Sequence, residues 1–253
     1  MIPIINDVVR FLFPACCFGC GKRLDYTEEF ICDKCFGSMH RTCYHYQKHS
    51  RLELFLATME MYPSPVKAAA AFFYGETVKK MALYFKKPKG AKMAEYVGYM
   101  YVCEILSTHP DYFDGIDAVV PVPTRQQKRL FRKYNHSEAF ARGIAKALDK
   151  PLLNDVVVKA QKTPPQKSLP RKMRAKDLGS VYRLIHADGI VGKHLLLVDD
   201  VVTSGATIRT VMRQLVSVDG VRVSVIALAH ATAKSIAFKT EEYPVFNEFP
   251  SCE

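Results

Sequence analysis

The sequence contains no apolar run long enough to cross a membrane. Its longest uninterrupted apolar segment, residues 68–74, is far shorter than the about 20 residues that a spanning helix requires. The N-terminal stretch is apolar, but Asp7 and Arg10 interrupt it, and it lacks the basic start and continuous apolar core of a signal peptide. We therefore expect a cytoplasmic protein without a transmembrane segment, whose membrane contact is limited to recruitment at the inner face.

The sequence also lacks internal repeats and low-complexity tracts. Hydrophobic residues make up 49% of the chain, which is typical of a globular protein and excludes a disordered one. A length of 253 residues allows one good-sized domain with a small appendage.

Acidic residues are missing from two strongly basic tracts. The whole chain has 36 lysines and arginines against 25 acids, a net charge of +11. Residues 125–133 contain five basic side chains and residues 159–176 contain seven, with no acid in either tract. A third basic cluster consists of Lys79, Lys80, Lys86, Lys87, Lys89 and Lys92. A solvated helix face would intersperse acids among bases, so these tracts predict a polyanionic partner, first of all nucleic acid.

Four cysteines form two C-x2-C pairs separated by eleven residues: Cys17 with Cys20, and Cys32 with Cys35. Each pair brings two thiolates to one tight turn, and two such turns supply the tetrahedral sulfur set that structural zinc prefers. Cys16 is an alternative to Cys17, although only Cys17 keeps the C-x2-C spacing. A redox pair is the other interpretation of a cytosolic C-x2-C. A module of this size buries little apolar surface, so we expect metal to stabilise its fold.

The run LLLVDDVVTSGAT, residues 195–207, carries the most specific chemistry. Residues 195–198 predict a buried strand, followed by two carboxylates and a small-residue loop that opens a helix. Ligands of open α/β sheets bind at the carboxyl ends of strands, and free N–H groups at a helix N-terminus bind phosphate. Two adjacent carboxylates can accept hydrogen bonds from the two hydroxyls of a diol. A sugar phosphate therefore suits both the carboxylates and the phosphate-binding loop. The alternative is an ordinary turn in which a threonine or serine caps the helix.

Strand and helix patterns alternate along the rest of the chain. Strands are predicted at residues 68–74, 118–122, 156–158, 182–185, 195–198 and 221–229. Helices are predicted at residues 76–85, 91–106, 125–148 and 207–216. This alternation indicates an α/β domain with a parallel sheet.

The run at residues 195–207 is similar to the PRPP (5-phosphoribosyl-1-pyrophosphate) signature of type I phosphoribosyltransferases. The resemblance implies that Asp199 and Asp200 hold the ribose 2′- and 3′-hydroxyls. It also implies that the loop wraps the 5′-phosphate, and that Mg²⁺ accompanies PRPP. The implied PRPP-binding residues are Asp199, Asp200, Val201, Val202, Thr203, Ser204, Gly205, Ala206 and Thr207.

Nearly the whole chain resembles the ComF family, in which a zinc ribbon precedes a phosphoribosyltransferase-like domain. The motifs are the two cysteine pairs, the sequence VPVP at residues 120–123, RKYNHSE at 132–138, residues 166–182 and the PRPP signature. Two positions depart from the family pattern, because Lys133 replaces a glycine and Asp177 stands where asparagine is usual. The implied units are a zinc ribbon at residues 1–50, a connector at 51–66 and a phosphoribosyltransferase-like domain at 67–253.

The resemblance also implies further site residues. The pyrophosphate loop would consist of Pro121, Val122, Pro123, Thr124 and Arg125. Cations that could stabilise departing pyrophosphate are Arg125, Lys167, Arg171 and Arg174. Residues expected to contact DNA are Arg125, Lys128, Arg129, Arg132, Lys133, Lys172 and Arg174.

Members of this family are implicated in natural competence, where they handle incoming single-stranded DNA. The expected function is therefore PRPP binding and single-stranded DNA handling during DNA uptake, with a competence helicase or recombination proteins as partners. A catalytically active phosphoribosyltransferase with an unidentified acceptor is the first alternative. A PRPP-sensing regulator of duplex DNA is the second, although no helix-turn-helix is recognisable.

Overall fold

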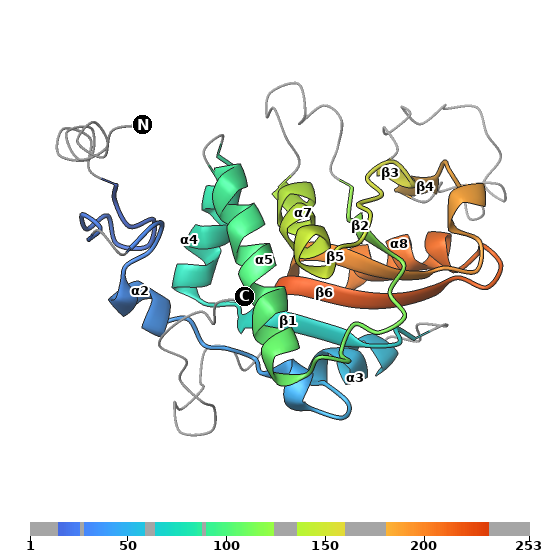
Figure 1. Cartoon of the computed structure of the whole chain (residues 1–253), viewed down its shortest axis with the longest axis horizontal. Helices are drawn as coiled ribbons and strands as arrows, with labels where there is room; N and C mark the ends of the chain where they lie inside the picture. The colour runs from blue at the N-terminus through green and yellow to red at the C-terminus, as the bar shows by residue number, and fades with distance from the viewer. Residues whose placement is uncertain are drawn as a thin grey trace, which may run out of the picture.

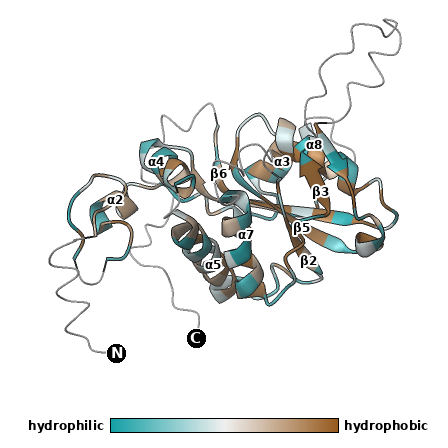
Figure 2. Ribbon diagram, turned by 90° about the horizontal axis from the view of Figure 1, so that it is seen from above, coloured by the Kyte–Doolittle hydropathy of each residue, from teal (hydrophilic) through white to brown (hydrophobic). Residues whose placement is uncertain are grey.

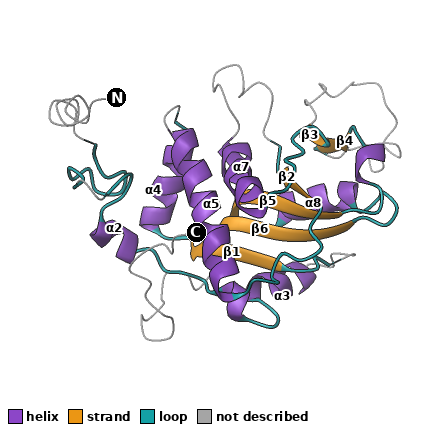
Figure 3. Cartoon of the chain, in the orientation of Figure 1, coloured by secondary structure: helices purple, strands orange, loops and turns teal. Residues whose placement is uncertain are grey.

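A four-stranded parallel sheet forms the centre of the computed structural model, which describes residues 15–25, 28–58, 64–87, 90–123, 136–159 and 181–232. Its strand order is β1-β6-β5-β2 (Figures 1 and 3). The strands are β1 (Ala68–Phe73), β2 (Ala118–Pro121), β5 (His194–Val202) and β6 (Arg222–His230). All neighbouring strands pair in parallel, which confirms the predicted α/β class.

Helices cover both faces of this sheet. One face carries α4 (Glu76–Phe85), α5 (Gly90–Thr108) and α7 (His136–Leu148), and the other carries α3 (Arg51–Thr58) and α8 (Ala206–Leu215). Side chains of β5 alternate between the two cores, as the period of a strand requires. Leu196 and Val198 join the α4, α5 and α7 side, whereas Leu195 and Leu197 join the α3 and α8 side. Figure 2 shows the mainly apolar strands between these helices.

Helices α5 and α7 approach each other through glycines. A Cβ atom on Gly143 of α7 would lie 1.9 Å from the carbonyl oxygen of Glu95 on α5. A Cβ on Gly98 of α5 would lie 2.3 Å from the carbonyl oxygen of Phe140 on α7. The absence of side chains at these two positions therefore fixes α7 against α5, and with it His136, the first residue of α7.

A separate antiparallel ribbon, β3 (Val157–Lys159) and β4 (Tyr182–Leu184), lies at the β2 side of the sheet (Figure 1). Strand patterns at both positions were predicted correctly, but as part of the parallel alternation. Val157 and Tyr182 turn inward and join the core beneath α8, which is how the ribbon is anchored without extending the sheet.

The cysteine segment lies at the opposite end of the molecule, with the short helix α2 (Asp33–Gly37) (Figure 1). Beyond it, the chain runs along the edge of β1, where Thr42 N–H donates to the Ala71 carbonyl at 3.2 Å. A one-turn helix, η1 (Tyr44–Tyr46), and α3 follow. The segment predicted as a connector contains helix α3. Its buried Leu52 and Leu56 are spaced by one helical turn, as on the buried face of a helix. The domain limits at residues 50 and 66 stay predictions.

A second 3-10 turn, η2 (Asp188–Ile190), leads into β5. Within the described ranges, no helix combines the length and apolar character that a bilayer crossing needs.

Candidate functional site

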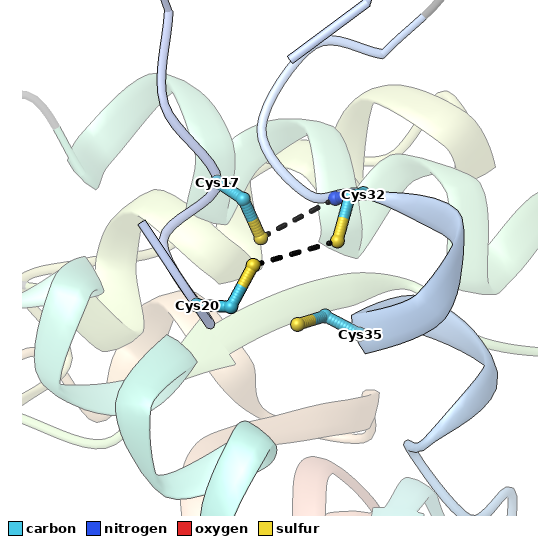
Figure 4. A group of neighbouring side chains, drawn as sticks. All are labelled: Cys17, Cys20, Cys32 and Cys35. Carbon is cyan, nitrogen blue, oxygen red and sulfur yellow. Dashed lines mark hydrogen bonds between the residues drawn. The ribbon is translucent and has the colours of Figure 1, made fainter. Parts of the chain in front are cut away.

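Four cysteine side chains bring their sulfur atoms close together near α2 (Figure 4). The Sγ atoms of Cys17, Cys20, Cys32 and Cys35 all lie within 4.8 Å of one another. The sulfurs of Cys20 and Cys32 are 3.7 Å apart. Tetrahedral zinc with bonds of about 2.3 Å would separate its sulfur ligands by about 3.8 Å. The donor set and its spacing therefore fit a four-coordinate thiolate metal site.

Backbone groups prepare this cluster for thiolates. The N–H groups of Gly19 and Cys32 each donate to Cys17 Sγ at 3.3 Å. Burial opposes ionisation of Cys17, but these backbone donors outweigh it and lower its pKa to about 7. Burial and the neighbouring thiols raise the pKa of Cys35 to about 12.

Glycine is needed inside the cluster. A Cβ atom on Gly19 would lie 2.9 Å from Cys35 Sγ, so a larger residue would displace that ligand. Cys16 is exposed and stands outside the four-sulfur group. Among the described residues, this group is the sole cluster with suitable metal-ligating geometry, and Cys43 and His45 are not members of it.

The second site is built at the carboxyl end of β5. Asp199 and Asp200 lie near the end of this strand, and their side chains alternate between the two faces of the sheet. Asp199 follows Leu197 on the side of α3 and α8, and its Oδ1 atom accepts the N–H of Asp200 at 2.9 Å. Asp200 follows Val198 toward α4 and α7. The two carboxyl groups remain close enough to interact with each other.

Asp200 is ionised, and its carboxylate contacts a histidine and a lysine. Its Oδ2 atom lies 3.0 Å from His136 Nε2 and 3.6 Å from Lys86 Nζ. Burial opposes ionisation, but His136 and Lys86 outweigh it and lower the pKa of Asp200 to about 2. Burial, followed by the charge of Asp200, raises the pKa of Asp199. The pair thus consists of Asp200, which stays ionised, and Asp199, whose ionisation is disfavoured.

The loop after β5 has the geometry of an anion cradle. Gly205 precedes α8 with φ of 65°, a left-handed conformation that glycine adopts without strain. Thr203 and Ser204 are exposed, so their hydroxyls are accessible to a ligand. The first N–H groups of α8 have no acceptor inside the helix and point away from its N-terminus. Loop amides, hydroxyls and a helix N-terminus converge beside two carboxylates.

Strand β2 brings part of the predicted pyrophosphate loop close to this loop. Because β2 pairs with β5 in parallel, Pro121 is in register with Val198, and Val122 N–H donates to the Val198 carbonyl at 2.8 Å. Pro121, Val122 and Pro123 therefore lie at the same edge of the sheet as the two aspartates.

The remaining predicted site residues lie outside the described residues. These are Thr124, Arg125, Lys128, Arg129, Arg132, Lys133, Lys167, Arg171, Lys172 and Arg174. Phe85, which lies beside one of the basic clusters, is fully buried and packs in the core.

Three groups near the aspartates were not predicted from the sequence: Lys86, His136 and the pair formed by Lys159 and Tyr182. Lys159 Nζ donates to the Tyr182 hydroxyl at 2.9 Å across the β3–β4 ribbon. Lys86 was noted only as one member of a basic cluster, and nothing in its local sequence links it to β5. His136 lies inside the motif RKYNHSE at residues 132–138, and this position was the only signal available.

Comparison with known proteins agrees with this geometry. A family model for the phosphoribosyl transferase domain matches residues 135–249. Competence protein F of Haemophilus influenzae is 28% identical over 116 residues, which cover 46% of this chain and 51% of that protein. The chain is similar to competence protein F over about half of its length. The resemblance to the ComF family is confirmed, together with the fold class that it implied.

Several further proteins are similar to parts of this chain. The DNA utilization protein YhgH of Escherichia coli is 28% identical over 99 residues, or 39% of this chain and 43% of that protein. The chain thus spans about half the length of the curated relatives it matches. An adenine phosphoribosyltransferase from Thermoanaerobacter pseudethanolicus has a TM-score of 0.34 and 21% identity, covering 67% of this chain and 80% of that one. An allosteric regulatory enzyme of purine biosynthesis has a TM-score of 0.41 and 18% identity, covering 57% of this chain and 30% of that one.

Proposed function

We propose that this chain binds PRPP and handles single-stranded DNA during DNA uptake. The proposal of PRPP binding is supported by the end of β5, where two carboxylates adjoin a glycine loop at the start of α8. Asp199 and Asp200 would hold the ribose hydroxyls. The amides and hydroxyls of residues 203–207 would hold the 5′-phosphate. The pyrophosphate would lie toward residues 121–125, with Mg²⁺ supplying charge neutralisation when PRPP is bound.

Calorimetry with PRPP and Mg²⁺ tests the ligand. The double variant Asp199→Ala, Asp200→Ala should lose measurable binding, because both diol acceptors are gone. Asp155→Ala is the matched control, since this exposed aspartate pairs with His186 at 3.2 Å on the molecular surface. Unchanged affinity in the double variant would refute the site.

The DNA half rests on the basic tracts and on the names of the relatives, which refer to competence and DNA utilization. Mobility shifts of labelled single strands should show binding at low salt. Charge reversal at Arg125, Lys128, Arg129 and Arg132 should weaken it. The slope of its salt dependence should fall by about 0.7 for each DNA phosphate that the variant no longer neutralises. Lys146→Glu with Lys150→Glu, at the far end of α7, is the control. Binding indifferent to reversal within residues 125–132 would count against this assignment.

We propose zinc as the ion of the four-cysteine cluster. The all-sulfur donor set and its spacing support zinc over hard cations such as Mg²⁺ or Ca²⁺, which prefer oxygen. The ion would be structural, since four protein ligands leave no open coordination position. Equal occupancy by iron in protein purified from cells grown with both metals would contradict this choice.

A catalytic phosphoribosyltransferase is the second candidate, favoured by one observation. Val157 and Tyr182 of the β3–β4 ribbon share a core with Ile208 of α8, so the ribbon lies beside the helix whose N-terminal loop would hold the sugar phosphate. In such a reaction, the acceptor forms a bond to the anomeric carbon and pyrophosphate leaves. Pyrophosphate release from PRPP that depends on an added nucleobase, amine or DNA would establish it. The predicted cytoplasmic location and the helicase or recombination partners belong to the DNA-uptake proposal.

A further inference from the structure

Two side chains from outside the PRPP-like motif hold Asp200. Lys86 directly follows α4 and His136 begins α7, so the two residues are far apart in the sequence. Both meet the same carboxylate oxygen, Oδ2, at 3.6 Å and 3.0 Å. The Asp200 side chain is only 16% exposed and that of His136 only 15%, so this contact is shielded from bulk solvent.

The contacts leave little freedom in the Asp200 carboxylate. Its Oδ1 atom accepts the N–H of Val201 at 2.8 Å. A carboxylate offers about four acceptor positions, and Val201, His136 and Lys86 together occupy three. The Asp200 carboxylate is thus held in one orientation by Lys86, His136 and the Val201 amide. The neighbouring Asp199 carboxyl instead accepts the N–H of Asp200 at its Oδ1 atom, at 2.9 Å.

We propose that Lys86 and His136 are positioning residues that make the sugar-phosphate site select ribose over 2-deoxyribose. This inference rests on the proposed function. A fixed, shielded carboxylate gains one strong hydrogen bond from a ribose 2-hydroxyl, whereas a deoxy sugar leaves its acceptor unpaired and desolvated. The site would thereby reject the deoxyribose phosphate at a DNA end, and DNA would bind at a different surface.

Paired calorimetric titrations test this, using ribose 5-phosphate and 2-deoxyribose 5-phosphate as probes. The wild-type protein should prefer the ribose form on the order of ten- to a hundredfold, the range of a hydrogen bond to a charged group. Lys86→Met and His136→Gln should each lose most of this preference, while the affinity for the deoxy sugar changes little. Lys86→Arg keeps the charge and should restore the preference.

Two matched controls share the same chemistry away from the site. Lys79→Met removes another α4 lysine, which pairs with Glu76 at 3.3 Å. His186→Gln removes a surface histidine that pairs with an aspartate at 3.2 Å. Both should leave the ribose preference at its wild-type value, and thermal melting of each variant checks that the fold is retained.

The outcomes separate this inference from the proposed function. Wild-type protein that binds neither sugar phosphate overturns both. Wild-type preference for ribose that persists in Lys86→Met and His136→Gln overturns the positioning role alone. An equal loss of both ligands in folded variants would also overturn it, because Lys86 and His136 would then act on the phosphate. The two substitutions are independent, so either one that folds decides the matter.

Discussion

Replacing one cysteine of the four-sulfur cluster should release its metal and open the surrounding segment. Cys17 is the most informative position, because its sulfur accepts two backbone N–H groups, from Gly19 and Cys32, at 3.3 Å each. The apolar cluster of this segment is small and consists of Leu24 with two of the cysteines themselves. One buried leucine contributes about 1.5–3 kcal/mol, whereas a structural zinc ion contributes about 10–16 kcal/mol.

Loss of the metal therefore exceeds what packing in this segment can offset. In Cys17→Ser, metal content should fall from one equivalent toward zero. The amides of Gly19 and Cys32 should lose their protection from hydrogen exchange. The parallel sheet should keep its protection, because few polar contacts join it to the cluster, such as that of Lys80 Nζ with the Gly19 carbonyl at 2.8 Å.

Cys16→Ser is the matched control, since its thiol is adjacent in sequence but exposed and outside the cluster. It should keep a full metal complement and the protected amides. A full complement in Cys17→Ser, or loss of metal in Cys16→Ser, would refute the ligand assignment.

Three further predictions concern stability. Gly143→Ala should destabilise the protein by about 1–2 kcal/mol in urea unfolding. Alanine has a helix propensity about 1 kcal/mol better than that of glycine. Its Cβ, however, would lie 1.9 Å from the Glu95 carbonyl oxygen, which cannot rotate away, and this clash outweighs the gain. Glu104→Gln should cost about 3–5 kcal/mol, because it removes the carboxylate charge that lies 2.7 Å from the buried Arg41 guanidinium. The pKa of Asp200 is lowered to about 2 from an ordinary 3.8, which implies about 2 kcal/mol of stability. This contribution is full above about pH 4 and is lost as the pH falls through about 2. Asp200→Asn should remove this acid dependence in unfolding measured from pH 2 to 5.

Each of these has a contradicting outcome. Wild-type stability in Gly143→Ala would mean that α5 and α7 separate freely. Gly37→Ala is the control: its Cβ would meet nothing within 4 Å, so it should show the gain in helix propensity without a clash. An unchanged unfolding midpoint in Glu104→Gln would mean that Arg41 reaches solvent. Equal acid dependence in wild type and Asp200→Asn would place the titrating group elsewhere.

Local signals in the sequence were sufficient for the elements that form the sheet. The bounds of α4 were predicted in full, because its apolar spacing is regular and a glycine precedes it. The strand at β5 was predicted from four consecutive apolar residues, but its extension through Val202 was not, since charged side chains interrupt the pattern. Helix α3 was missed because prolines follow closely and its apolar face is narrow.

The site divides in the same way. Asp199, Asp200 and the glycine loop are contiguous, so their chemistry is legible in one short segment. Lys86 and His136 reach Asp200 only because α4 and α7 pack on the same face of the sheet. Nothing in the sequence near Lys86 specifies that packing, which depends on long-range contacts such as the glycine approach between α5 and α7. The cysteine cluster was predictable because ligand spacing alone determines it.

A crystal structure of the protein with PRPP and Mg²⁺ tests the central claim most directly. We expect the 5′-phosphate within hydrogen-bond distance of the amides of residues 203–207. The ribose hydroxyls should lie on Asp199 and Asp200, with Lys86 and His136 still in contact with Asp200. A ligand bound away from the carboxyl end of β5, or a site that stays empty at saturating PRPP, would contradict the proposed PRPP site.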